Sequence, residues 1–224
     1  IDATAANNVR AIFEDSQGRL WIGTRGAGLM LFDPEARTFT DFSAPLRQAL
    51  GRGAEQTIAV HAIAPAAAGS LWIGTDHGVL LFDPASRSAR RLDLGKPPAA
   101  QDRYRGILVD SDGSLWLAGL DSGLVHYRTG TGVIARYDST NGLADDYVFR
   151  VARDSKGRLW VGMLRGLSLY DPLHKTFRTC REEPGRHDSL AGSRVTALRT
   201  DSNGDPWLPT APGTHTVGAL DGHA

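Results

Sequence analysis

The sequence lacks several features that define common classes of protein. Cys180 is the only cysteine among 224 residues, which excludes an internal disulfide and a cysteine-based metal site. Lys and Arg number 25, as do Asp and Glu, so no net positive charge would attract nucleic acid or an anionic membrane. No apolar run approaches the roughly 18 residues of a membrane span. These absences leave a folded globular protein with no nucleic-acid partner.

All five tryptophans lie on one repeating frame. Leu20–Thr24 reads Leu-Trp-Ile-Gly-Thr and returns unchanged at Leu71–Thr75, with variants at Leu115–Gly119 and Leu159–Met163 and a worn copy at Pro206–Thr210. Successive tryptophans are 51, 44, 44 and 47 residues apart. A fixed period of this length indicates a repeat architecture, in which function belongs to loops on one face rather than to a single catalytic motif.

The first repeat is typical of four short strands separated by turns. A run rich in apolar and β-branched residues at 9–13 precedes an Asp-Ser-Gln-Gly turn at 15–18, and the tryptophan strand follows. A glycine-rich turn leads to a third apolar run at 29–32, which Asp33-Pro34 ends, and residues 38–42 alternate as a fourth strand. This order of strands and turns predicts an antiparallel meander.

A single four-stranded sheet cannot bury both of its faces, whereas stacking each sheet on the next with a tryptophan between them does so. Radial stacking of four-stranded units of about 40–50 residues is a β-propeller. We therefore predict an all-β fold, a single partial β-propeller over residues 1–224 with about four full blades of four antiparallel strands plus a degraded fifth. The predicted blades cover residues 8–42, 58–94, 103–138, 146–180 and 194–221.

The fifth repeat departs from the frame. Pro206 and Pro209 fall where the second strand should pair, and residues 218–224 offer no third and fourth strands of normal pattern. Proline has no N–H for a strand ladder, so we expect this blade to be broken and the propeller to be open at that end. The chain also starts at Ile1 rather than at a methionine, and we expect it to be a piece of a longer protein.

With the repeat laid out, a family resemblance becomes specific. The pattern Asp-Ser-x-Gly-Arg-Leu-Trp-Ile-Gly-Thr, followed by Gly-x-Gly-Leu and Phe-Asp-Pro, closely resembles the two-component-regulator propeller repeat. The segments at 140–148 and 187–195 are similar to that family's lead-in to a blade, so the resemblance runs from about Asn7 to Asp205.

The resemblance implies a ligand-sensing domain, often for carbohydrates, in the periplasm. It implies a membrane span and an output domain, a histidine kinase or a diguanylate cyclase, in the same polypeptide. Members usually have seven blades, which at this period would occupy about 310 residues. The family has no catalytic motif, so the resemblance assigns no catalytic residue.

Two sets of residues are candidates for binding a ligand on one propeller face. The loops after the second strands hold Arg25, Asp76, His77, Asp121 and Arg165, each of which is either a ligand contact or part of a solvated turn. The innermost strands begin near Arg105 and Tyr147, among others. Arginine forms bidentate bonds to a carboxylate such as a uronate, and tyrosine stacks on sugar rings, although both side chains also pack well between blades.

The first interval between tryptophans is the longest because of an insertion at residues 43–57. Long loops in compact domains are commonly functional or disordered. Leu46–Leu50 could form one helical turn that caps the ligand-binding face.

Catalytic and metal chemistry find little support in the sequence. The Asp-Ser-Asp-Gly segment at 110–113 is too short for an EF-hand and recurs in other repeats as a turn. The histidines form no His-x-x-x-His pair for zinc, there is no Gly-x-Ser-x-Gly elbow, and Cys180 lacks a nucleophile signature. We therefore predict no catalytic residues, no metal site and no cofactor.

The leading hypothesis is a non-catalytic sensor segment that binds a small molecule, with saccharides as the candidate class. A second hypothesis is an enzyme resembling the streptogramin lyase propellers, which would need His61 or His77 to share a metal with an acidic residue. A third is a structural repeat that mediates homodimer formation and passes a signal through that interface.

Overall fold

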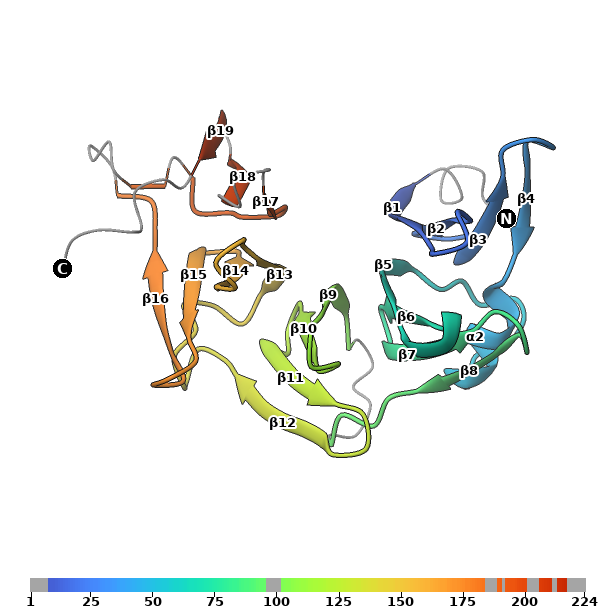
Figure 1. Cartoon of the computed structure of the whole chain (residues 1–224), viewed down its shortest axis with the longest axis horizontal. Coiled ribbons are helices and arrows are strands. Elements are labelled where there is room, and N and C mark those ends of the chain that lie inside the picture. The colour runs from blue at the N-terminus through green and yellow to red at the C-terminus, as the bar shows by residue number, and fades with distance from the viewer. Residues whose placement is uncertain are drawn as a thin grey trace. The chain divides into compact units, whose positions relative to one another are not determined.

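The structure is a computed structural model that describes residues 8–95, 102–183, 189–190, 192–200, 206–210 and 213–216. In these residues the strands form five antiparallel sheets, four with four strands and one with three (Figure 1).

Each four-stranded sheet follows chain order, as a meander requires. The first sheet comprises β1 (Val9–Glu14), β2 (Leu20–Thr24), β3 (Leu29–Asp33) and β4 (Thr38–Asp41). The second comprises β5 (Val60–Pro65), β6 (Leu71–Thr75), β7 (Gly78–Asp83) and β8 (Ser88–Arg91). The third comprises β9 (Tyr104–Val109), β10 (Leu115–Gly119), β11 (Leu124–Arg128) and β12 (Gly132–Tyr137). The fourth comprises β13 (Val148–Arg153), β14 (Leu159–Met163), β15 (Gly166–Asp171) and β16 (Thr176–Cys180).

The fifth sheet corrects the expectation that Pro206 and Pro209 prevent a strand. Both lie in β18 (Pro206–Thr210), which pairs with the short β17 (Arg199–Thr200) on one side and with β19 (Gly213–Thr216) on the other. A proline loses only its own N–H, so the remaining residues can still pair. Burial favours the strand as well, because Leu208 is fully buried in the core of this part of the chain. The tail at 218–224 lies outside the described residues.

The chain divides into two compact units. One runs to Leu115 and includes Tyr127–Val133, and the other holds Trp116–His126 and continues from Ile134. The first unit therefore contains the first two sheets together with β9, and the second contains the fourth and fifth sheets.

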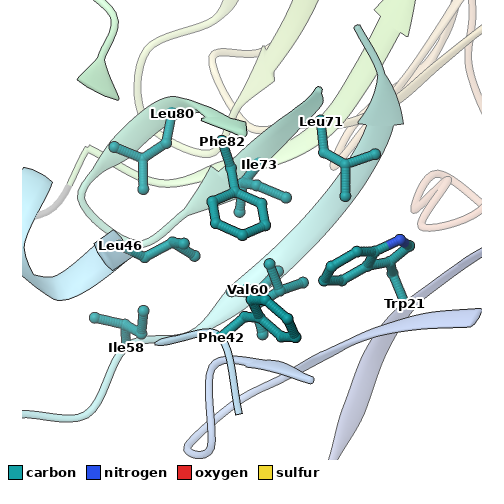
Figure 2. Close-up of a cluster of buried hydrophobic side chains, with 10 residues drawn as sticks. Trp21, Phe42, Leu46, Ile58, Val60, Leu71, Ile73, Leu80 and Phe82 are labelled. Carbon is teal, nitrogen blue, oxygen red and sulfur yellow. The ribbon is translucent and has the colours of Figure 1, made fainter. Parts of the chain in front are cut away.

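The core of the first unit is built around a tryptophan of the frame. Trp21 is fully buried and makes edge contacts with Phe42 and Phe82, at ring-centroid distances of 5.1 and 5.9 Å. Figure 2 shows these rings among the aliphatic side chains of the same cluster. Because Trp21 comes from the first sheet and Phe82 from the second, the tryptophan is a wedge between neighbouring sheets, as the repeat predicted.

The insertion forms a helix, α2 (Ser43–Ala49), which covers most of the predicted residues 46–50 but does not lie where it was expected to cap a ligand-binding face. It contacts β7 and β8, the outer strands of the second sheet (Figure 1). Leu46 is fully buried in the cluster around Trp21, so the helix contributes to the core instead of capping a ligand-binding face. Among the described residues no helix is long and apolar enough to cross a bilayer.

An aspartate at the first turn of the repeat binds the tryptophan of the frame. Asp154 accepts hydrogen bonds from Trp160 Nε1 at 2.9 Å and from Arg158 Nε at 2.5 Å, and its other oxygen accepts two backbone N–H groups of the turn. In the first sheet Asp15 binds Trp21 and Arg19 in the same way. The Asp-x-x-Gly-Arg-x-Trp pattern is therefore a structural device that satisfies the indole N–H of a buried tryptophan.

The glycine two residues after the tryptophan allows neighbouring sheets to approach closely. A Cβ atom on Gly74 would lie 2.7 Å from the backbone oxygen of Tyr104 in β9, and one on Gly23 would lie 2.6 Å from Cγ1 of Val60 in β5. Both distances are shorter than a carbon atom tolerates, so the second strand of one blade packs against the inner strand of the next only because it has no side chain there.

We expect Gly74→Ala to destabilise the protein by about 1–3 kcal/mol, because backbone must shift to admit the methyl group. Urea denaturation measures this loss. Gly53→Ala is the matched control, since a Cβ at Gly53 meets nothing within 4 Å, and it should change stability by less than about 0.5 kcal/mol. Equal losses in the two variants would show that the close approach is not what the glycine provides.

We expect Asp154→Ala to cost about 1–3 kcal/mol, because the buried indole N–H of Trp160 loses its acceptor. Burial raises the pKa of Asp154, but the hydrogen bonds from Trp160 and Arg158 outweigh it and leave the pKa below its ordinary value. The ionised carboxylate therefore stabilises the fold above pH about 3.9 and loses this effect as the pH falls through the lowered pKa.

Urea denaturation at neutral pH and across the acidic range tests this expectation. The stability of Asp154→Ala should fall less steeply on acidification than that of the parent protein. Asp93→Ala, which removes an exposed carboxylate, is the control. An acid dependence that is the same in all three proteins would contradict the assignment.

Candidate ligand-binding pocket

The first unit contains a polar cavity of about 500 Å³ at the inner strands of three successive sheets. Its walls come from β1 and the turn after β2, from β5 and the turn between β6 and β7, and from the start of β9 (Figure 1). The lining residues are Arg10, Arg25, His61, Asp76, His77, Arg103 and Arg105. We refer to this cavity as the basic pocket, because four arginines and one aspartate leave it strongly positive.

A repeated irregularity places side chains at this pocket. The register between the first two strands shifts between Val9 and Ala11 in β1 and between Val60 and Ala62 in β5. The intervening residues, Arg10 and His61, are bulge residues, which are re-aimed relative to the regular alternation of a strand. Both line the basic pocket.

The turn after the second strand is fixed against the start of the inner strand. The N–H of Arg25 donates to the backbone oxygen of Asn8 at 2.9 Å, which holds this turn beside β1. In the second sheet Thr75 is fully buried, donates to the backbone oxygen of Gly78 at 2.8 Å and accepts the N–H of His77 at 3.0 Å. The backbone beneath Arg25, Asp76 and His77 is therefore well ordered by hydrogen bonds.

The closest polar contact in the pocket joins His61 to Asp76. His61 Nε2 lies 2.5 Å from Asp76 Oδ1, and the histidine side chain is only 5% exposed. Burial raises the pKa of Asp76, but the hydrogen bond with His61 and the charges of His61, His77 and Arg105 outweigh burial and leave the pKa below its ordinary value. Asp76 is therefore ionised at neutral pH and lies in a positive environment.

The structure brings together some of the predicted ligand residues and separates others. Arg25, Asp76, His77 and Arg105 all line the basic pocket. Tyr147 and Arg165 line a different cavity, in the second unit. Asp121 is exposed in the turn between β10 and β11 and lines neither cavity.

The cavity in the second unit is smaller, about 210 Å³, and is lined by loop residues around Tyr147 and Leu164. Asp145 organises it: one carboxylate oxygen accepts the N–H of Tyr147 at 2.8 Å, and the other lies 3.3 Å from Arg165 Nε. Asp145 is buried, whereas the Arg165 side chain is 75% exposed. The carboxylate of Asp145 is thus already bound by two residues of this cavity, Tyr147 and Arg165.

Arg10 and Arg103 were missed as pocket residues, and His61 was considered only as a metal ligand. The position of these residues within the repeat could have identified Arg10 and His61. Arg10, His61 and Arg105 occupy one position of the repeat, immediately after the first residue of the inner strand. The bulge that turns Arg10 and His61 toward the cavity is a matter of strand register, which the sequence pattern does not reveal.

The described residues contain no group of three or more His, Cys, Asp or Glu side chains placed to hold a metal ion. His61 and His77, the residues that a lyase-like metal site would need, both lie at the basic pocket with Asp76. Burial raises the pKa of the Cys180 thiol, which disfavours the thiolate that a nucleophile requires.

Known structures identify these sheets as the blades of a β-propeller. The extracellular domain of the hybrid two component system BT3049 from B. thetaiotaomicron has 21% identity and a TM-score of 0.74, over 94% of this chain and 28% of that one. The corresponding domain of BT4673 from the same organism has 19% identity and a TM-score of 0.77, over 94% of this chain and 27% of that one. The chain thus spans little more than a quarter of either domain.

The same fold occurs in virginiamycin B lyase from Staphylococcus aureus, at 13% identity and a TM-score of 0.65, over 93% of this chain and 69% of that one. Because all these identities are low, the likenesses show the fold alone. They confirm the predicted partial propeller of about four full blades and a reduced fifth.

The family model described as two component regulator propeller matches residues 5–26 and 142–165. The resemblance found in the sequence to this family's repeat is thereby confirmed. No curated protein matches the chain.

We expect His61 and Asp76 to be coupled in stability. A double-mutant cycle with His61→Ala and Asp76→Asn should give a coupling free energy of about 1 kcal/mol or more, because each single change leaves a partner in a largely buried place. The exposed pair His174 and Asp171, whose atoms lie 2.6 Å apart, provides a matched control with a smaller coupling. Equal coupling in the two pairs would argue against a special role for the pocket pair.

Proposed function

We propose that the chain is part of the ligand-sensing propeller of a bacterial signal-transduction receptor and has no catalytic activity of its own. It binds a small acidic molecule, such as a saccharide that carries a carboxylate, in the basic pocket. The observation that carries this proposal is the convergence of four arginines on one cavity at the loop ends of three blades. Guanidinium groups bind carboxylates with paired, charge-assisted hydrogen bonds.

The family repeats and the fold support the sensing role. The similar structures are described as extracellular domains of two component systems, and we infer a periplasmic location for this chain by analogy with them. On the same analogy, the output domain is a histidine kinase or a diguanylate cyclase in the same polypeptide. The proposed binding site includes neither Tyr147 nor Arg165, because both line the second cavity, where Asp145 already engages Arg165.

Calorimetric titration with galacturonate and glucuronate, and with neutral galactose and glucose, tests the proposal. The acidic sugars should bind, and Arg105→Ala should weaken them roughly ten- to hundredfold, the usual effect of losing a charge-assisted hydrogen bond. Circular dichroism checks that the variant is folded, and Arg105→Lys serves as a second variant that keeps the charge.

Arg90→Ala and Arg165→Ala are the matched controls. Each removes one arginine charge, from the outer strand β8 or from the second unit, and neither residue lines the basic pocket. Their affinities should equal that of the parent protein. Absence of binding for every acidic and neutral sugar, or equal losses in Arg90→Ala and Arg105→Ala, would contradict the proposed function.

A further inference from the structure

The positive charges of the basic pocket are arranged in two pairs. Arg10 and Arg25 both belong to the first sheet, and Arg103 and Arg105 both belong to the start of the third. Tyr104, between the latter two, is 1% exposed and anchors that segment in the core. The pocket therefore has two cationic walls, one from each of these sheets.

The second sheet lies between the two walls. Its inner strand β5 contacts β1 and also contacts β9, and Figure 1 shows β5 between them. The pocket residues from this sheet are His61, Asp76 and His77. His61 and Asp76 bind each other at 2.5 Å, so the wall between the two arginine pairs carries a carboxylate and a hydrogen-bonded imidazole instead of further guanidinium groups.

This order of charges suits a ligand with two acidic groups. A carboxylate at either arginine pair gains charge-assisted hydrogen bonds, whereas a carboxylate against the second sheet would meet the ionised Asp76. A neutral, hydroxylated middle would instead find an acceptor in Asp76. The four arginines and the one aspartate together carry a net positive charge of three, so a dianion still enters a positive cavity.

We propose that the basic pocket selects dianionic ligands, whose two acidic groups bind separately, one at Arg10 and Arg25 and the other at Arg103 and Arg105, with a neutral segment along Asp76. The inference rests on the proposed function of this pocket and adds the class of ligand. It makes Asp76 a specificity-determining residue that disfavours a third acidic group.

The test uses the full chain and a homologous series of straight-chain dicarboxylates (succinate, adipate, suberate and sebacate), each with the monocarboxylate of equal length. Calorimetry gives the affinities. One dicarboxylate length should bind roughly ten- to hundredfold more tightly than its monocarboxylate, because a second set of charge-assisted bonds forms. Removing either pair, by Arg10→Ala with Arg25→Ala or by Arg103→Gln with Arg105→Gln, should abolish this preference while leaving monocarboxylate binding measurable.

The matched control is Arg90→Ala with Arg165→Ala, which removes the same charge elsewhere and should keep the preference. Asp76→Asn should increase affinity for the tricarboxylate citrate more than for the best dicarboxylate. If monocarboxylates bind as tightly as every dicarboxylate, the inference fails while the proposed function stands. If no acid binds but a neutral sugar does, the inference fails. The proposed sensing role then stands, but the proposed acidic class of ligand is wrong. If nothing binds, both fail.

Discussion

The fold depends on a close approach between the second strand of one blade and the inner strand of the next. The tryptophan frame supplies two features of the second strand that this contact requires. Trp21 fills the space between sheets, and two residues later Gly23 has no side chain where Val60 must pass. In the second unit Gly162 faces Val195 in the same way, because a Cβ there would lie 2.8 Å from Cγ1 of Val195. Dense packing of this kind tolerates little change in volume.

The same constraint decides where chemistry can vary. The residues of the contact are fixed by packing, whereas the side chains of the bulge residue and of the turn after the second strand are not part of that contact. In the first two blades these positions hold Arg10, His61, Arg25 and Asp76, and they form the basic pocket. A rigid scaffold that leaves polar loop positions free is the usual basis for a binding site in a repeat fold.

The repeat made the blades predictable, because a tryptophan, a glycine and a turn at a fixed period leave few alternative folds. Two departures were not predictable from pattern alone. Pro206 and Pro209 still lie in a paired strand, since the burial of Leu208 outweighs the lost N–H groups. Leu46 lies in a helix at the core because the insertion brings this apolar residue into the buried cluster that also holds Phe82, a tertiary arrangement that no local pattern specifies.

The candidate site was predictable only in part, for a related reason. The turns after the second strands gave Arg25, Asp76 and His77, but also Arg165, which belongs to another cavity. The starts of the inner strands gave Arg105, but also Tyr147, which lies at that other cavity as well. The fourth blade explains this separation. At the bulge of β13 it carries Phe149, and in its second turn the N–H of Leu164 binds the backbone oxygen of Tyr147, as Arg25 binds Asn8 in the first blade. Equivalent backbone positions thus carry charge in the first blade and apolar side chains in the fourth, so the repeat fixes the geometry of every blade while individual side chains confine the charged site to the first three.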